Sequence, residues 1–147
     1  MIPTSVSADR RASAERWRTI LIIDDESGVL DLCREILERE GGYQVVTAYR
    51  PSDGVELAFE VQPDLILLDI TMPRINGWEV MRVLKSEPET QDIPIAVLTV
   101  RNHMRDKLLS LKGGALDFLQ KPEVLDDLPG RVRRIFERLE REAEPSP

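Results

Sequence analysis

The chain has 147 residues, of which 41% are apolar and 32% are charged. These values are ordinary for a folded domain and exclude a wholly disordered chain, a collagen and a membrane bundle. No apolar run approaches the roughly 20 residues that cross a bilayer, and the N-terminus lacks the apolar core of a signal peptide. The single cysteine, Cys33, excludes an intrachain disulfide and a cysteine-ligated zinc site. We expect one cytoplasmic domain without a membrane segment.

The charge balance is acidic, with 20 Lys and Arg residues against 27 Asp and Glu residues and a net charge of −7. Nonspecific binding to nucleic acid depends on clustered cations that face phosphate groups. We therefore expect no direct DNA binding.

The chain divides by composition into three parts. Residues 1–18 are polar and contain four arginines, which predicts a flexible N-terminal extension. Residues 19–141 predict the folded domain, and residues 142–147 predict a C-terminal tail.

Within the domain, short β-branched apolar runs alternate with amphipathic segments. The runs predict strands at 19–23, 44–48, 64–69, 93–99 and 115–119. The amphipathic segments predict helices at 27–40, 52–61, 76–85, 103–112 and from Asp126 or Asp127 to Glu144. Alternating strands and helices predict a parallel sheet covered on both faces, with ligands at the carboxyl ends of the strands.

Side chains that can carry chemistry come directly after the predicted strands. Asp24 and Asp25 follow the first strand, Asp69 ends the third, Thr99 ends the fourth and Lys121 follows the fifth. Three neighbouring carboxylates repel one another, so they need a counter-charge. Lys121 supplies one, and a hard divalent cation such as magnesium (Mg²⁺) would supply more. Such a cluster is typical of phosphoryl transfer. The sequence has no P-loop and no glycine-rich dinucleotide turn, so we expect the phosphoryl group to arrive on a small donor or another protein.

Five short motifs accompany these residues. They are Ile22-Ile23-Asp24-Asp25-Glu26, Leu67-Leu68-Asp69-Ile70-Thr71-Met72-Pro73, Asn76-Gly77-Trp78-Glu79, Leu98-Thr99 and Phe118-Leu119-Gln120-Lys121-Pro122. In this order and at these intervals they resemble the receiver domain of two-component response regulators, over residues 19–141. The resemblance implies a flavodoxin-like, doubly wound α/β fold of five βα units, with a five-stranded parallel sheet in the order 2-1-3-4-5.

The resemblance also implies a role for each residue of the cluster. Asp69 would be the phosphoacceptor, a carboxylate nucleophile that forms an acyl phosphate. Asp25 and Asp69 would ligate Mg²⁺ directly, Asp24 would act through water, and the backbone carbonyl of Thr71 would complete the protein ligands. Lys121 would pair with a phosphoryl oxygen, and its bond to the following proline would be cis.

A switch and its partners are implied in the same way. Thr99 would bind a phosphoryl oxygen and move toward the site, and Phe118 would turn inward as it does so. This movement would change the surface formed by the helix at 103–112, the strand at 115–119 and the last helix. The implied partners are a histidine kinase or histidine phosphotransfer protein and an output protein, and the same surface is a candidate for a homodimer. We expect a stand-alone regulator that is not an enzyme beyond its own phosphotransfer and dephosphorylation.

Three positions depart from the family pattern. Val100 replaces the usual small residue beside the phosphoryl pocket, which predicts narrower access. Phe118 lacks the hydroxyl of the commoner tyrosine. Pro129 and Gly130 weaken the start of the last helix.

Two other functions remain open at this stage. The first is an interaction module that keeps the fold but signals without phosphorylation, which Val100 favours. The second is a Mg²⁺-dependent phosphatase, which Thr71 disfavours because those enzymes carry a second aspartate at that position. Three further residues are expected to be structural: Cys33 and Trp78 through packing, and His103 as a solvated residue at a helix start.

Overall fold

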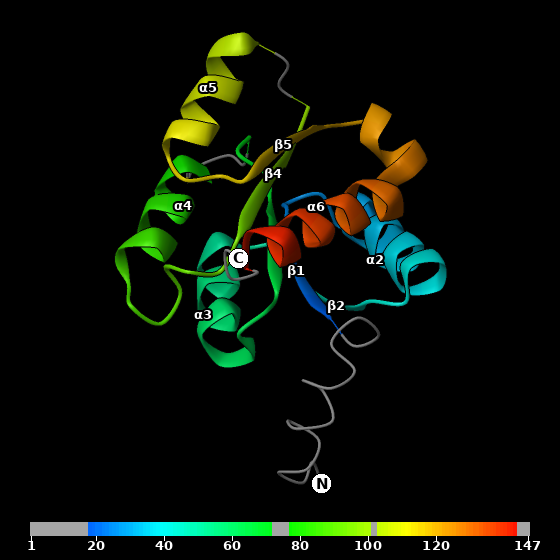
Figure 1. The fold of residues 1–147 in the computed structure, drawn as a ribbon, viewed down its shortest axis with the longest axis horizontal. Helices are drawn as coiled ribbons and strands as arrows, with labels where there is room; N and C mark the ends of the chain where they lie inside the picture. Colours follow the sequence, from blue (N-terminus) through cyan, green and yellow to red (C-terminus); the bar gives the residue numbers. More distant parts are fainter. Residues whose placement is uncertain (1–17, 72–76, 101–102, 144–147) are drawn as a thin grey trace, which may run out of the picture.

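A computed structural model describes residues 18–71, 77–100 and 103–143 of the chain (Figure 1). Five strands form one sheet: β1 (Thr19–Ile23), β2 (Gln44–Ala48), β3 (Leu65–Leu68), β4 (Ile95–Thr99) and β5 (Asp117–Gln120). Their order is β2-β1-β3-β4-β5, and every neighbouring pair is parallel. The expected fold class and strand order are confirmed.

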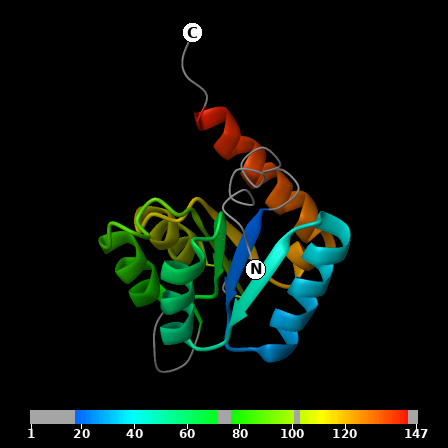
Figure 2. The same cartoon turned by 90° about the horizontal axis from the view of Figure 1, so that it is seen from below.

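Helices cover both faces of the sheet (Figure 2). They are α2 (Ser27–Gly41), α3 (Pro51–Val61), α4 (Gly77–Ser86), α5 (Met104–Lys112) and α6 (Leu128–Ala143), with a short 3₁₀ helix, η1 (Glu123–Asp127), before α6. Helices α2 and α6 lie on one face, and α3, α4 and α5 lie on the other (Figures 1 and 2). Among the described residues, no helix combines the length and apolar character required to cross a bilayer.

The central strands are apolar at every position because both of their faces are covered. Ile20 and Ile22 of β1 pack into the core beneath α2 and α6, and Leu21 and Ile23 pack into the core of the opposite face. All four side chains are fully buried. Burial of this kind explains why continuous apolar runs, rather than alternating ones, predicted these strands. Cys33 is buried in the first of the two cores, as expected.

Local sequence signals explain where α2 ends and where α3 begins. Gly42 adopts a left-handed conformation with φ of 71°, and its N–H donates to the carbonyl of Leu37. This is the common glycine stop signal, and it was expected for the Gly41-Gly42 pair. Pro51 opens α3, where a missing N–H costs nothing because the first helical amides have no intrahelical partner.

The largest differences from the predicted boundaries are in β4, β5 and the last helix. Strand β4 starts at Ile95 rather than at residue 93, so Pro94 precedes the strand instead of lying in it. Strand β5 covers 117–120 rather than 115–119, because its register with β4 runs from Ala96↔Asp117 to Thr99↔Gln120. The last helix starts at Leu128, and the η1 turn before it was not predicted.

Residues 1–17 of the expected N-terminal extension and residues 144–147 of the expected tail lie outside the described residues. Arg18, the last residue of that extension, packs on the domain. Its carbonyl accepts from the N–H of Gln44 at 2.9 Å, and its guanidinium lies 4.3 Å from the ring centroid of Phe136 and pairs with Glu140. Arg18 therefore joins the start of β1 to α6.

Candidate functional site

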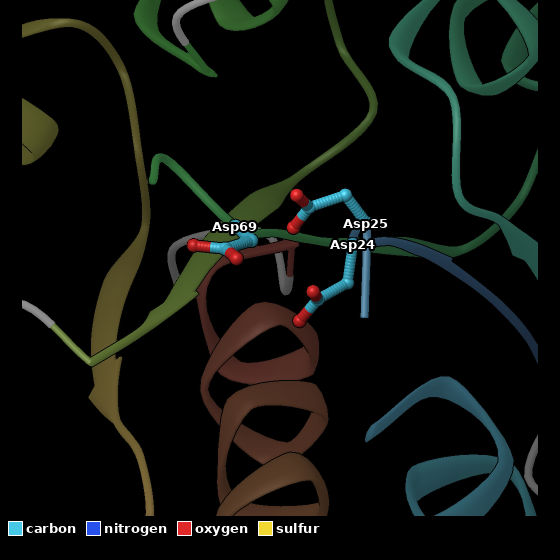
Figure 3. A group of neighbouring side chains, drawn as sticks. All are labelled: Asp24, Asp25 and Asp69. Atoms are coloured by element: carbon cyan, nitrogen blue, oxygen red, sulfur yellow. The ribbon is translucent and has the colours of Figure 1, made fainter. Parts of the chain in front are cut away.

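Three aspartates lie together at the carboxyl ends of the neighbouring strands β1 and β3 (Figure 3). Asp24 and Asp25 follow β1, Asp69 follows β3, and one oxygen from each lies within 4.8 Å of the others. Asp24 and Asp69 are buried, with 0% and 1% of their surface exposed. Asp25 is the most solvent-accessible of the three. The sheet topology produces this cluster, because neighbouring parallel strands end at the same edge.

Hydrogen bonds fix both the backbone and the carboxylate of Asp24. Its N–H donates to Ala48, and its Oδ1 accepts from the N–H of Glu26 at 3.0 Å. Its Oδ2 accepts from Nζ of Lys121 at 2.7 Å. Burial raises the pKa of Asp24 to about 6, although the hydrogen bond from Lys121 lowers it, and the charge of Asp69 raises it further.

Lys121 supplies the counter-charge. Its N–H donates to Thr99 at 2.7 Å, and its peptide bond to Pro122 is cis, as expected. Its side chain is 4% exposed, and Nζ lies 3.7 Å from Oδ2 of Asp69 and 3.7 Å from a carboxylate oxygen of Glu26. Burial lowers the pKa of Lys121, but the hydrogen bond and charge of Asp24, with the other carboxylates, raise it more, so the net shift is upward. Lys121 therefore stays an ammonium at neutral pH.

The two oxygens of Asp69 have different surroundings. Oδ1 accepts two hydrogen bonds from Thr71, one from its N–H at 2.9 Å and one from its hydroxyl at 2.6 Å. Oδ2 is buried and accepts no hydrogen bond from the described residues. A buried acceptor without a partner is costly and needs an explanation. Thr71 therefore orients Asp69 through Oδ1, and Oδ2 can still accept a bond from a ligand.

Thr99 completes the arrangement at the end of β4. It is fully buried, and its hydroxyl oxygen lies 3.5 Å from the hydroxyl oxygen of Thr71. Only the backbone carbonyl of Thr71 was expected to contribute to the site, so the contact of its hydroxyl with Asp69 was not predicted. A hydroxyl two residues after an aspartate is the available signal, because such pairs form local side-chain hydrogen bonds.

Gly77, the first residue of α4, lies against the backbone next to Asp69. A Cβ at this position would lie 2.4 Å from Cα of Ile70 and 2.6 Å from the carbonyl oxygen of Asp69. Only glycine allows α4 to start this close to the site. The adjoining residues 72–76, including Pro73 and Asn76 of the motifs, lie outside the described residues.

Val100 directly follows the last residue of β4, and Phe118 belongs to β5. Val100 is 56% exposed, and Phe118 is half-buried on β5, where it packs against the core that includes Ile95 and Val97. The narrowing of access by Val100 and the inward movement of Phe118 both stay predictions.

The donor set fits a hard divalent cation. Each of the three carboxylates offers one oxygen, and these oxygens lie within 4.8 Å of one another. Mg²⁺ binds such oxygens and keeps several waters. Accessible Asp25 leaves one side of the cluster open to those waters.

A family model for the response regulator receiver domain matches residues 20–133. The chain belongs to this family. Receiver domains are signalling domains of two-component systems, and the observed strand order and acidic cluster agree with this membership.

Similar proteins support the assignment. The DNA-binding dual master transcriptional regulator RpaA of Synechocystis sp. is 38% identical over 122 residues, which are 83% of this chain and 50% of that protein. The chain thus spans about half the length of this curated relative.

Solved receiver structures share the fold. A CheY-like response regulator receiver domain protein from Methanospirillum hungatei JF-1 gives a TM-score of 0.77 at 27% identity, over 86% of this chain and 99% of that one. A two-component response regulator from Clostridium difficile gives 0.75 at 30% identity, over 83% of this chain and 98% of that one.

Proposed function

We propose that this receiver accepts a phosphoryl group on Asp69 from a histidine kinase or histidine phosphotransfer protein, in the cytoplasm. The observation that carries the proposal is the asymmetry of Asp69. Oδ1 is fixed by two hydrogen bonds from Thr71, whereas buried Oδ2 accepts none from the described residues and lies 3.7 Å from the ammonium of Lys121.

The proposed transfer follows from this asymmetry. Oδ2 of Asp69 attacks phosphorus, a new O–P bond forms, and the bond from phosphorus to the donor breaks with its electron pair leaving on the donor atom. Lys121 lies close enough to attract a phosphoryl oxygen, and Thr99 offers a second donor, its hydroxyl oxygen lying 3.5 Å from that of Thr71. Asp25 and Asp69, with Asp24 through water and the carbonyl of Thr71, would hold Mg²⁺, which neutralises charge on the transferring group.

The proposed output is a change in a protein-binding surface made of α5, β5 and α6. Thr99 ends β4 and pairs with Gln120 of β5, so a movement of Thr99 acts at the strand that carries Phe118. We propose that an output protein, or a second copy of the chain, reads this surface, and that the domain itself does not contact DNA. Hydrolysis of the acyl phosphate at the same site would end the signal.

Intact mass spectrometry tests the proposal. The chain is incubated with a small acyl-phosphate donor, with Mg²⁺ or with EDTA. We expect one phosphoryl adduct, present with Mg²⁺ and absent with EDTA. Asp69→Asn should abolish the adduct, and Asp53→Asn, which changes an exposed aspartate in the first turn of α3, should not.

If no adduct is found, a second experiment shows the reason. Beryllofluoride mimics a phosphoryl group without being hydrolysed, so binding of beryllofluoride would distinguish rapid hydrolysis from a closed site. Loss of both responses would leave the phosphorylation-independent interaction module as the function.

A further inference from the structure

The two buried residues of helix α5 are polar, and its large apolar side chains are exposed. Asp106 and Ser110, one turn apart, are its buried residues, with 6% and 0% of their surface exposed. Its large apolar residues are exposed: Met104 by 67%, Leu108 by 59%, Leu109 by 42% and Leu111 by 41%. A surface helix normally turns its apolar stripe toward the core. The core of this domain therefore does not use the leucines of α5.

A groove runs between α5 and α4, which are neighbours on one face of the sheet (Figure 1). Helix α5 packs mainly on β5 and only weakly on α4, so the groove stays open and has a volume of about 510 Å³. Trp78, Met81 and Leu109 give it an apolar lining. A second hollow of about 550 Å³ adjoins the groove, because Trp78 and Leu109 line both.

The rim of this groove is basic although the whole chain is acidic. Arg82, Lys85, Lys112 and Arg105 line it, and the carboxylate among the lining residues is the buried Asp106. Arg82 pairs with Glu79, and Lys85 donates to two backbone carbonyls. Within the described part of the chain, no carboxylate forms an ion pair with Arg105 or Lys112.

We propose that the groove between α4 and α5 binds an acidic amphipathic helix of a partner protein. The apolar face of that helix would cover Trp78, Met81 and Leu109. Its carboxylates would face Arg105 and Lys112, which lie two turns apart on α5 and are separated by about 10 Å along the axis. An apolar stripe flanked by matched charges is the usual pattern of helix-in-groove recognition. The groove shares α5 with the surface made of α5, β5 and α6 but lies on the side of α5 that faces α4, and the proposal does not depend on phosphorylation of Asp69.

A panel of three synthetic helical peptides tests the proposal. All three have about 18 residues, enough to form a helix once bound, and share one leucine face. Their flanks carry either glutamates seven residues apart, or lysines or glutamines at the same positions. The full chain carries Trp17→Phe, so that Trp78 is its only tryptophan.

Tryptophan fluorescence and backbone NMR shifts report binding. We expect the glutamate peptide to bind at least about tenfold more tightly than the lysine peptide, with shifts concentrated in α4 and α5. Failure of the glutamate peptide to bind, equal affinity for all three peptides, or shifts centred on another surface would overturn the proposal.

Matched variants on α5 distinguish binding in the groove from a nonspecific effect of the net charge of the chain. Lys112→Glu should weaken the glutamate peptide by about tenfold, whereas Lys107→Glu, the same change outside this groove, should leave its affinity nearly unchanged. Leu109→Ala should weaken binding more than Leu108→Ala, because Leu109 lines the groove and Leu108 does not. Equal effects within either pair would contradict the proposed site.

Discussion

The ammonium of Lys121 donates its hydrogen bond to Asp24, at 2.7 Å, and lies 3.7 Å from Oδ2 of Asp69. Asp24 therefore takes most of the stabilisation that Lys121 provides. Asp69 keeps one oxygen that is buried but accepts no hydrogen bond from the described residues. This is a suitable arrangement for a nucleophile, because a fully hydrogen-bonded carboxylate is less reactive.

Removing Lys121 should destabilise the fold. Lys121→Ala leaves Asp24 and Asp69 buried without their counter-charge, and we expect a loss of about 2–4 kcal/mol in unfolding free energy at neutral pH. Urea denaturation measures the loss, and added Mg²⁺ should restore part of it. The control is Lys112→Ala, an exposed lysine whose loss should change stability by less than about 0.5 kcal/mol. Equal stability of the two variants would contradict the role given to Lys121.

The hydroxyl of Thr71 should matter through its hold on Asp69. Thr71→Ala removes the 2.6 Å hydrogen bond to Oδ1 but leaves the one from the backbone N–H. We expect phosphorylation by a small acyl phosphate to slow by about fivefold, since one net hydrogen bond contributes roughly 1 kcal/mol. Thr71→Ser keeps the hydroxyl and should retain most of the rate. Indistinguishable rates for the alanine and serine variants would show that the hydroxyl has no part in positioning Asp69.

Two glycines give a matched test of the close approach at the site. Gly77→Ala places a Cβ within 2.6 Å of two backbone atoms beside Asp69, so the chain must shift. We expect a loss of about 2–3 kcal/mol in unfolding free energy, together with slower phosphorylation. Gly28→Ala, in the first turn of α2, meets nothing within 4 Å and should be neutral or stabilising by up to about 1 kcal/mol. The same thermal shift for both variants would argue against the tight contact.

The thiol of Cys33 should be unreactive while the chain is folded. Burial raises its pKa from 9.0 to about 11. The charge of Lys121 lowers this pKa slightly, and the charge of Asp24 raises it slightly. The folded state therefore holds this proton more tightly than the unfolded state. The resulting stabilisation is present below pH 9 and is lost as the pH rises toward about 11.

Two measurements check this behaviour. Labelling by an aromatic disulfide reagent should be slow in the native chain and fast in urea. The fall in unfolding free energy above pH 9 should be shallower in Cys33→Ala than in the wild type. Rapid labelling of the native chain would contradict the burial of Cys33.

The sheet and its acidic cluster could be predicted because each depends on local signals and topology. Strands β1 and β2 have the expected bounds, since short apolar runs ended by polar residues mark buried parallel strands. Asp24 and Asp69 then meet because neighbouring parallel strands end at one edge.

Other features depend on tertiary packing that the sequence pattern does not contain. The later start of β5, by two residues, follows from its register with β4, and the hydroxyl contact of Thr71 follows from the path of the chain after β3. The inverted burial of α5 is a third case. The sequence does not indicate that Leu108, Leu109 and Leu111 are exposed to solvent. The reason is that Asp106 and Ser110 become buried only when α5 packs on β5.

The most direct test of the central claim is to identify the residue that carries the phosphoryl group. Borohydride reduces an aspartyl phosphate to homoserine, so peptide mass mapping after treatment with an acyl phosphate, Mg²⁺ and borohydride locates the modified residue. The account predicts homoserine at position 69 and unmodified aspartates at 24 and 25. Homoserine at another aspartate, or none while beryllofluoride also fails to bind, would contradict it.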